Sequence, residues 1–283
     1  MAEVGAEDLR VISFTALKRA RRTLEDFALS YFPLHGLDLK DYIHHQHIFN
    51  FVEGLIYQTD DANEAMCLQE DKAHGQDFKH EGHKVLKDVL RGRHLLSDEV
   101  DKMLAQGDEY WRLERKICES LKLSAHFLKN SATTGFSLQE AQSASKMKSF
   151  DYRVLHCILH QVFTKSRSQL MMEFLELDEQ LLDIGDDLVD YEEDVIKNSF
   201  NIYRAYLYLY GADGGLKLAE YIAELEETRD TLLIQLPDDI QMAVTFRQKE
   251  AATKPGSDKW IIPAPIFNEA EFRNSQQTSS GSS

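Results

Sequence analysis

The chain has 283 residues, and its 48 Asp and Glu outnumber its 32 Lys and Arg, which gives a formal net charge of −16 at pH 7. This balance argues against a nucleic acid or an anionic membrane as the main partner, because phosphate binding requires a net basic face, and it leaves room for divalent metals. The 43 % of hydrophobic residues suffice for a large core. Three cysteines without close spacing argue against a disulfide framework or a zinc ribbon and favour a reducing compartment.

The start of the chain has neither the apolar stretch of a signal peptide nor the Arg- and Ser-rich pattern of a transit peptide. The longest apolar runs fall short of the about 20 residues that cross a membrane. We therefore expect a cytoplasmic protein with no transmembrane segment.

Helical patterns follow one another along the chain. Phe14, Leu24 and Tyr31 share a helical spacing, and the 203 residues between Pro33 and Pro237 (237 − 33 − 1) contain no proline, which permits long helices. Further helices are predicted over about residues 38–64, 97–127, 137–172, 172–195 and 216–233, with a last one from Pro237. The prediction is an all-α, single-domain bundle of roughly eight to ten helices over residues 1–253. The Pro-, Gly- and Ser-containing residues 254–283 are predicted to form an extended or disordered tail.

The first acidic cluster closes the apolar helix predicted over 38–64. Asp60, Asp61 and Glu64 fall within an arc of about 100° on this helix, so their carboxylates share one face. Like charges this close repel one another, and Mg²⁺, which prefers carboxylate oxygens, would relieve the repulsion. A solvated helix end is the alternative interpretation.

A second acidic cluster covers residues 173–194, where 11 of 22 residues are acidic and none is basic. One stripe of this helix is apolar and includes Phe174, Ile184 and Leu188, whereas five aspartates between Asp183 and Asp194 lie within an arc of about 100°. An ordinary solvated face would carry lysines for pairing along the helix. These acids therefore need a partner from elsewhere, either a metal or a basic patch on a neighbouring helix.

Together the two clusters resemble the paired motifs of the class I terpenoid synthase (isoprenoid synthase) superfamily. Asp60, Asp61 and Glu64 match its DDxx(D/E) motif, and the run from Asp186 to Asp194 resembles its second, (N/D)Dxx(S/T/D)xxx(E/D)-like motif. The motifs stand 126 residues apart (186 − 60), and the resemblance covers roughly residues 10–250. It implies an isoprenoid-synthase-like helical bundle.

The resemblance also implies a Mg²⁺-dependent lyase, similar to a terpene synthase, that ionises a prenyl diphosphate clamped between two Asp-rich helices. The implied metal ligands are Asp60, Asp61, Glu64, Asp186, Asp190 and Asp194. The Mg²⁺ ions would neutralise the leaving diphosphate as Lewis acids. As partners we expect a prenyl diphosphate and no nucleic acid, and a homodimer stays open.

Further candidates follow from what this chemistry requires. The diphosphate needs cationic donors. If the helix continues past Asp194, Lys197 and Arg204 extend the aspartate stripe, and Arg153 is similar in type to the Arg with which terpene cyclases sense diphosphate. A carbocation must be kept from water by apolar and aromatic walls, for which the candidates are Phe49, Tyr57 and Phe150.

Two other functions stay open. Asp190 stands where terpene cyclases more often carry Ser or Thr, and a non-catalytic helical interaction protein that retains the fold is the alternative. A His/Asp metallohydrolase is a third interpretation, for which the candidate residues are His44, His45, His47, His80 and His83. Dependence on Mg²⁺ discriminates the lyase from an interaction protein.

Overall fold

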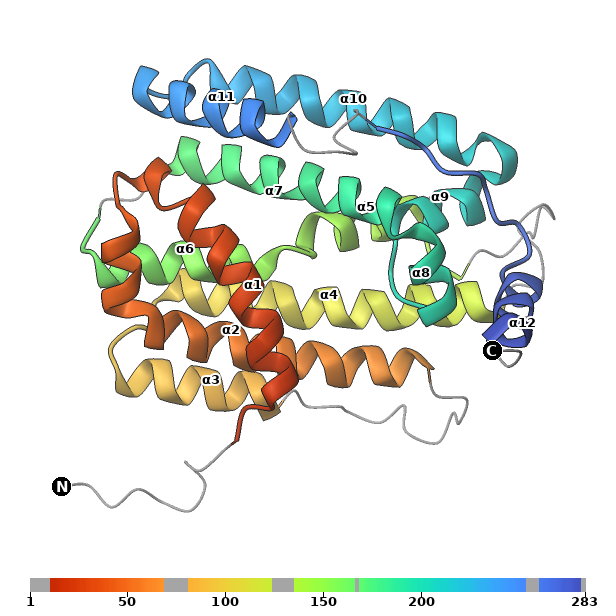
Figure 1. The fold of residues 1–283 in the computed structure, drawn as a ribbon, viewed down its shortest axis with the longest axis horizontal. Coiled ribbons are helices and arrows are strands. Elements are labelled where there is room, and N and C mark those ends of the chain that lie inside the picture. Colours follow the sequence, from red (N-terminus) through yellow and green to blue (C-terminus); the bar gives the residue numbers. More distant parts are fainter. Residues whose placement is uncertain (1–10, 69–80, 124–134, 166–167, 253–259, 281–283) are drawn as a thin grey trace.

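The computed structural model describes residues 11–68, 81–123, 135–165, 168–252 and 260–280. All regular elements in these ranges are helices, so the predicted all-α bundle is confirmed (Figure 1). They are α1 (Phe14–Ser30), η2 (Pro33–His35), α2 (Leu39–Leu68), α3 (Glu81–Gly92), α4 (Asp98–Leu123), α5 (Leu138–Met147), α6 (Phe150–Val162), α7 (Gln169–Val189), α8 (Tyr191–Lys197), α9 (Ile202–Tyr210), η4 (Gly211–Asp213), α10 (Gly214–Leu233), α11 (Asp238–Ala252) and α12 (Glu269–Ser280).

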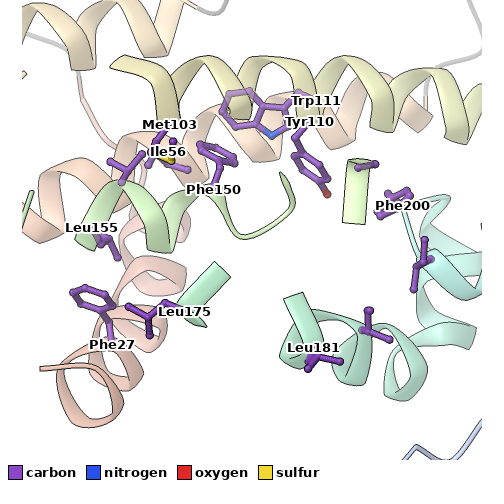
Figure 2. Packing of buried hydrophobic residues seen from close by; sticks show 14 of the residues in the cluster. Phe27, Ile56, Met103, Tyr110, Trp111, Phe150, Leu155, Leu175, Leu181 and Phe200 are labelled. Carbon is purple, nitrogen blue, oxygen red and sulfur yellow. The ribbon is translucent and has the colours of Figure 1, made fainter. Parts of the chain in front are cut away.

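The helices pack around one core. Helix α1 lies against α2, α4 contacts α5 and α6, and α7 packs on α10 (Figure 1). A row of aromatic rings runs along α4, in which Phe150 lies 5.2 Å from Trp111 and 6.5 Å from Tyr110, measured between ring centroids (Figure 2). Gly107 makes this packing possible, because a Cβ atom at that position would lie 2.4 Å from the ring of Phe150.

The prediction of one continuous helix over residues 137–172 is wrong, because the structure divides this stretch into α5, α6 and the start of α7. It begins as expected at Ser137, whose hydroxyl accepts the N–H of Glu140 in a capping box. It is interrupted at residues 148–149 and again after α6, where Thr164 takes a left-handed conformation (φ 49°) and the N–H of Lys165 bonds back to the carbonyl of His160. The predicted helix 172–195 also bends, at Asp190 between α7 and α8.

The C-terminal segment differs from the predicted extended or disordered tail. Residues 260–280 lie against the bundle and include α12. The hydroxyl of Tyr203 donates to the carbonyl of Pro263 over 3.0 Å, and the N–H of Ile266 donates to the hydroxyl of Tyr191 over 2.8 Å. These contacts join distant parts of the chain, so the composition of the segment did not reveal them.

Within the described ranges, no helix combines the length and the apolar character that crossing a membrane requires.

Candidate functional site

The first acidic cluster lies on α2 where that helix faces α1 and α4. Arg19 of α1 pairs with both aspartates: its Nη2 lies 3.0 Å from Oδ2 of Asp60, and its Nη1 contacts Asp61. The indole N–H of Trp111 donates to the other oxygen of Asp60 over 2.9 Å. Two of the predicted metal ligands are therefore neutralised by a cation of the chain itself.

Glu64 is the carboxylate of this cluster that lacks such a partner. It is half-buried, and no hydrogen bond to its side chain is found among the described residues. Burial, followed by the charge of Asp60, raises the pKa of Glu64 to about 7, while the charges of Arg19 and Lys197 oppose this rise. Nearby positive charges therefore do not fully neutralise this carboxylate, which is a property expected of a cation-binding group.

This raised pKa predicts a pH-dependent stability. Folded Glu64 holds a proton between its ordinary pKa and about 7, whereas the unfolded chain has lost it. Its stabilising contribution is therefore complete below about pH 4.5 and is lost as the pH rises through about 7. We expect Glu64→Gln to reduce the loss of unfolding free energy between pH 5 and 8 by about 2 kcal/mol, measured by denaturant unfolding. Glu25→Gln, on the exposed side of α1, is the control, and an unchanged profile in Glu64→Gln would contradict the prediction.

The second cluster lies on α7 and α8, at either side of the bend. Asp186 and Asp190 are exposed, and no hydrogen bond to either carboxylate is found in the described part of the chain. Asp194 is half-buried and accepts the side-chain amide of Asn201 over 2.9 Å. Burial raises the pKa of Asp194 to about 6, against the effect of this hydrogen bond. Helical backbone bonds continue across the bend, from the N–H of Asp190 to the carbonyl of Asp186 and from the N–H of Asp194 to the carbonyl of Asp190.

Most other acids of α7 have basic partners on neighbouring elements. These pairs are Asp187 with Lys148, Asp178 with Arg229 and Arg247, Glu176 with Lys146, and Glu179 with Arg153 and His156. The alternative of a basic patch on neighbouring helices is therefore confirmed for these residues. It does not extend to Asp186 and Asp190.

Glu114 of α4 connects the two acidic segments. Its carboxylate accepts the side-chain amide of Asn63 over 2.6 Å and the N–H of Phe200 over 3.4 Å. Asn63 lies within the first cluster, and Phe200 follows α8. Burial and the charges of Asp60 and Glu64 raise the pKa of Glu114 to about 8.

Asn198 makes a second connection, after the last residue of α8. Its side-chain amide donates to the carbonyl of Cys67 on α2 over 3.1 Å and to that of Cys118 on α4 over 3.4 Å. The C-terminal ends of α2, α4 and α8 thus meet at one place, which is why the charge of Lys197 acts on both Glu64 and Asp194. The fold brings the two predicted clusters to the same end of the bundle.

The predicted diphosphate contacts are separated by the fold. Lys197 is exposed, pairs with Glu193 and lies between the clusters. Arg153 is buried between α6 and α7, where its Nη1 lies 3.7 Å from Glu179 and its Nη2 donates to the carbonyl of Lys146.

Arg204 does not extend the aspartate stripe, so that expectation is wrong. The helix ends at Lys197 because Asn198 is left-handed (φ 54°), and Asn201 then caps α9 by accepting two backbone N–H groups. Arg204 is fully buried on α9, and its guanidinium donates to Glu269, Asn198 and the carbonyls of Asp194 and Ser199. All of its donors are engaged within the chain.

Two of the three predicted wall residues adjoin the first cluster. The guanidinium of Arg19 lies 4.4 Å from the ring centre of Tyr57, and Phe150 packs on Trp111. Phe49 instead lies in the aromatic core, with Phe27 and Phe32 as neighbours.

The candidate histidines that the structure describes do not lie in either acidic cluster. His44, His45 and His47 lie near the start of α2, more than three turns before Asp60. His83 lies on α3 and its Nδ1 is 2.9 Å from Asp108, while His80 lies outside the described residues.

Three residues of the site were missed by sequence reasoning: Arg19, Trp111 and Lys148. Arg19 belongs to a basic stretch of α1 that reads as a solvated face, and nothing in the local sequence assigns Trp111 or Lys148 to an acid on another helix. Among the residues that the structure describes, no three acidic, histidine or cysteine side chains converge closely enough to hold a metal ion as they stand. Comparisons of the chain with protein families, with curated proteins and with solved structures gave no match.

Proposed function

We propose that this chain is a Mg²⁺-dependent lyase, similar to a terpene synthase, that ionises a prenyl diphosphate between its two acidic clusters. The observation that carries the proposal is the meeting of the two clusters, 126 residues apart (186 − 60), at one end of the bundle through Glu114 and Asn198. A structural role alone gives no reason for collecting carboxylates of the same sign from two helices. Binding of positively charged Mg²⁺ ions would explain why the fold collects them.

The donor set fits Mg²⁺ in its chemistry, because this ion is bound by carboxylate oxygens. Glu64, Asp186 and Asp190 have carboxylates without a hydrogen-bonding partner in the described ranges. Asp60 and Asp61 would become available to the metal if Arg19 left its pairs with them, and Asp194 would complete the set. When bound, Mg²⁺ supplies a Lewis acid that neutralises the charge of the leaving diphosphate.

The side chains around the clusters supply the remaining requirements. Arg19 and Lys197 lie beside the acids of the first and the second cluster and can donate to diphosphate oxygens. The rings of Tyr57, Trp111 and Phe150 border the first cluster, and in the proposed reaction such aromatic surroundings would keep water from the carbocation.

Because Arg19 occupies Asp60 and Asp61, it competes with the metal. We expect Arg19→Gln to bind Mg²⁺ severalfold more tightly, since each of its two partly exposed ion pairs contributes about 0.2–1 kcal/mol. Titration calorimetry with Mg²⁺ measures the change. Arg21→Gln, which removes an exposed pair on the same helix, is the control. Unchanged or weaker Mg²⁺ binding by Arg19→Gln would show that the arginine does not exclude the metal.

Release of inorganic diphosphate from geranyl, farnesyl and geranylgeranyl diphosphate tests the proposed function. We expect release from at least one of them, dependent on Mg²⁺ and abolished by chelation. Absence of release from all three, in a folded protein that contains Mg²⁺, would contradict the proposal.

The second candidate is a non-catalytic helical interaction protein. The observation that favours it is the neutralisation of Asp60, Asp61 and Asp187 by Arg19 and Lys148, which makes a folded structure without metal feasible. Such a protein would be indifferent to Mg²⁺ in the same assay. Its acidic face would then bind a basic partner.

A further inference from the structure

Helices α2 and α4 lie side by side and run in the same direction (Figure 1). Two hydrogen bonds set their register. The indole N–H of Trp111 donates to Asp60 over 2.9 Å, and the side-chain amide of Asn63 donates to Glu114 over 2.6 Å. In both pairs the residue of α4 stands 51 positions after the residue of α2 (111 − 60 and 114 − 63). The two helices therefore stay in step along this part of their contact.

Cys67 and Cys118 continue the same register, because 118 − 67 is again 51. Each cysteine follows the bonded residue of its own helix, Asp60 or Trp111, by seven positions. Seven residues make about two turns, so each cysteine returns to the face that carries the hydrogen bond. Parallel helices keep facing residues in contact at this spacing. The register thus places the two cysteines opposite each other across the contact of α2 with α4.

Contacts of the two cysteines agree with this placement. The side-chain nitrogen of Asn198 donates to the carbonyl of Cys67 over 3.1 Å and to the carbonyl of Cys118 over 3.4 Å, so the two residues share one donor atom. Both thiols are free. Contact with the thiol of Cys67, followed by burial, raises the pKa of Cys118 well above its usual range.

The two thiols differ in their access to solvent. Cys118 is fully buried, whereas Cys67, the next-to-last residue of α2, is only half-buried. A thiol reacts as its thiolate, and the raised pKa of Cys118 keeps that group protonated. Cys67 is therefore the thiol that meets an oxidant first, and Cys118 lies beside it as the second thiol. An accessible cysteine next to a resolving cysteine is the usual arrangement of a redox-sensitive pair.

We propose that Cys67 and Cys118 are a peroxide-sensitive pair that forms a reversible disulfide between α2 and α4. The sulfur of Cys67 attacks hydrogen peroxide: an S–O bond forms, the O–O bond breaks, and the leaving oxygen departs as water with the thiol proton. The sulfur of Cys118 then attacks the sulfur of Cys67: the S–S bond forms, the S–O bond breaks, and a second water leaves with the proton of Cys118. The two thiols lose two electrons, and the peroxide gains them.

The bridge would lie beside the candidate site. Glu64 stands three residues before Cys67 on α2, and Glu114 stands four residues before its cysteine on α4, which is about one turn in each case. The disulfide would join covalently the two helices that the bond between Asn63 and Glu114 joins in the reduced protein. The inference does not depend on the proposed function, because it concerns the thiols alone.

Thiol counting and peptide mapping of the folded wild-type protein test the pair. After brief exposure to hydrogen peroxide, we expect the free thiols to fall from three to one and the mass of the monomer to fall by two hydrogens. Digestion should release one cross-linked peptide that contains Cys67 and Cys118, and dithiothreitol should restore all three thiols. Retention of three thiols, a bridge to any other cysteine, or oxidation of Cys67 that stops at the sulfenic or sulfinic acid would overturn the inference.

Two variants show whether the pairing is specific. Cys157 lies on α6, whose Gln161 donates to Ser97 just before the start of α4, far from Cys118 near its end. The control Cys157→Ala should therefore still lose two thiols to peroxide. Cys67→Ser should keep both remaining thiols, since those are buried. A bridge in Cys67→Ser, or none in a folded Cys157→Ala protein, would contradict the assignment.

Discussion

Replacement of Arg204 by Met is expected to lower the free energy of unfolding by about 3–5 kcal/mol, the cost of breaking a buried ion pair by removing one partner. Arg204 and Glu269 are both almost fully buried, and the guanidinium makes two hydrogen bonds of 2.7 and 2.8 Å to the carboxylate. The variant leaves the charge of Glu269 in the interior without a partner. It also removes the donors to two backbone carbonyls, those of Asp194 and Ser199.

Denaturant unfolding of a small set of variants checks this expectation. The double variant Arg204→Met/Glu269→Met should recover part of the loss, because no buried charge remains. Arg273→Met, which removes a more exposed partner of the same carboxylate, should cost less. A loss of less than about 1 kcal/mol in Arg204→Met would show that the pair does not hold the C-terminal segment.

Asp61→Asn and Asp186→Asn are each expected to slow Mg²⁺-dependent diphosphate release by about 10²–10³-fold, the usual cost of removing one group that stabilises charge in a transition state. The two residues come from different clusters, so both losses are needed if the clusters act together. Folding should persist, because Asp186 is exposed and Asp61 is one-third exposed.

The release rate as a function of Mg²⁺ concentration measures this effect. Glu192→Gln, an exposed acid on α8 outside the aspartate stripe, is the matched control. Full activity in Asp186→Asn would remove the second cluster from the mechanism. Full activity in Asp61→Asn would do the same for the first.

The parts of the fold that follow from local sequence could be predicted. The apolar stripe of α7 is buried at Phe174, Ile184 and Leu188, because a 3.6-residue period is a property of the chain segment itself. The shared face of Asp60 and Glu64 follows in the same way from one continuous helix. The capping box at Ser137 is likewise local.

The parts that depend on contacts through space could not be predicted. The prediction that Arg204 extends the aspartate stripe assumed one continuous helix from Asp194 to Arg204. It fails because Asn198 adopts a left-handed conformation and Asn201 caps a new helix. The C-terminal segment is held by the buried ion pair between Arg204 and Glu269, and no local sequence pattern predicts this pair. Arg19 reaches Asp60 and Asp61 from another helix, so an acidic motif gave no sign of the cation that neutralises it.

Thermal unfolding of the wild-type protein with Mg²⁺, with inorganic diphosphate, and with both shows whether the two acidic clusters bind metal and diphosphate together. A ligand that binds the native state at about 100 times its Kd stabilises it by about 2.7 kcal/mol, which corresponds to a rise of about 5–10 °C for a chain of this size. We expect this rise only when both are present, because the clusters bind metal and diphosphate as one assembly. An unchanged midpoint in all three conditions would contradict a metal–diphosphate site between the two acidic clusters.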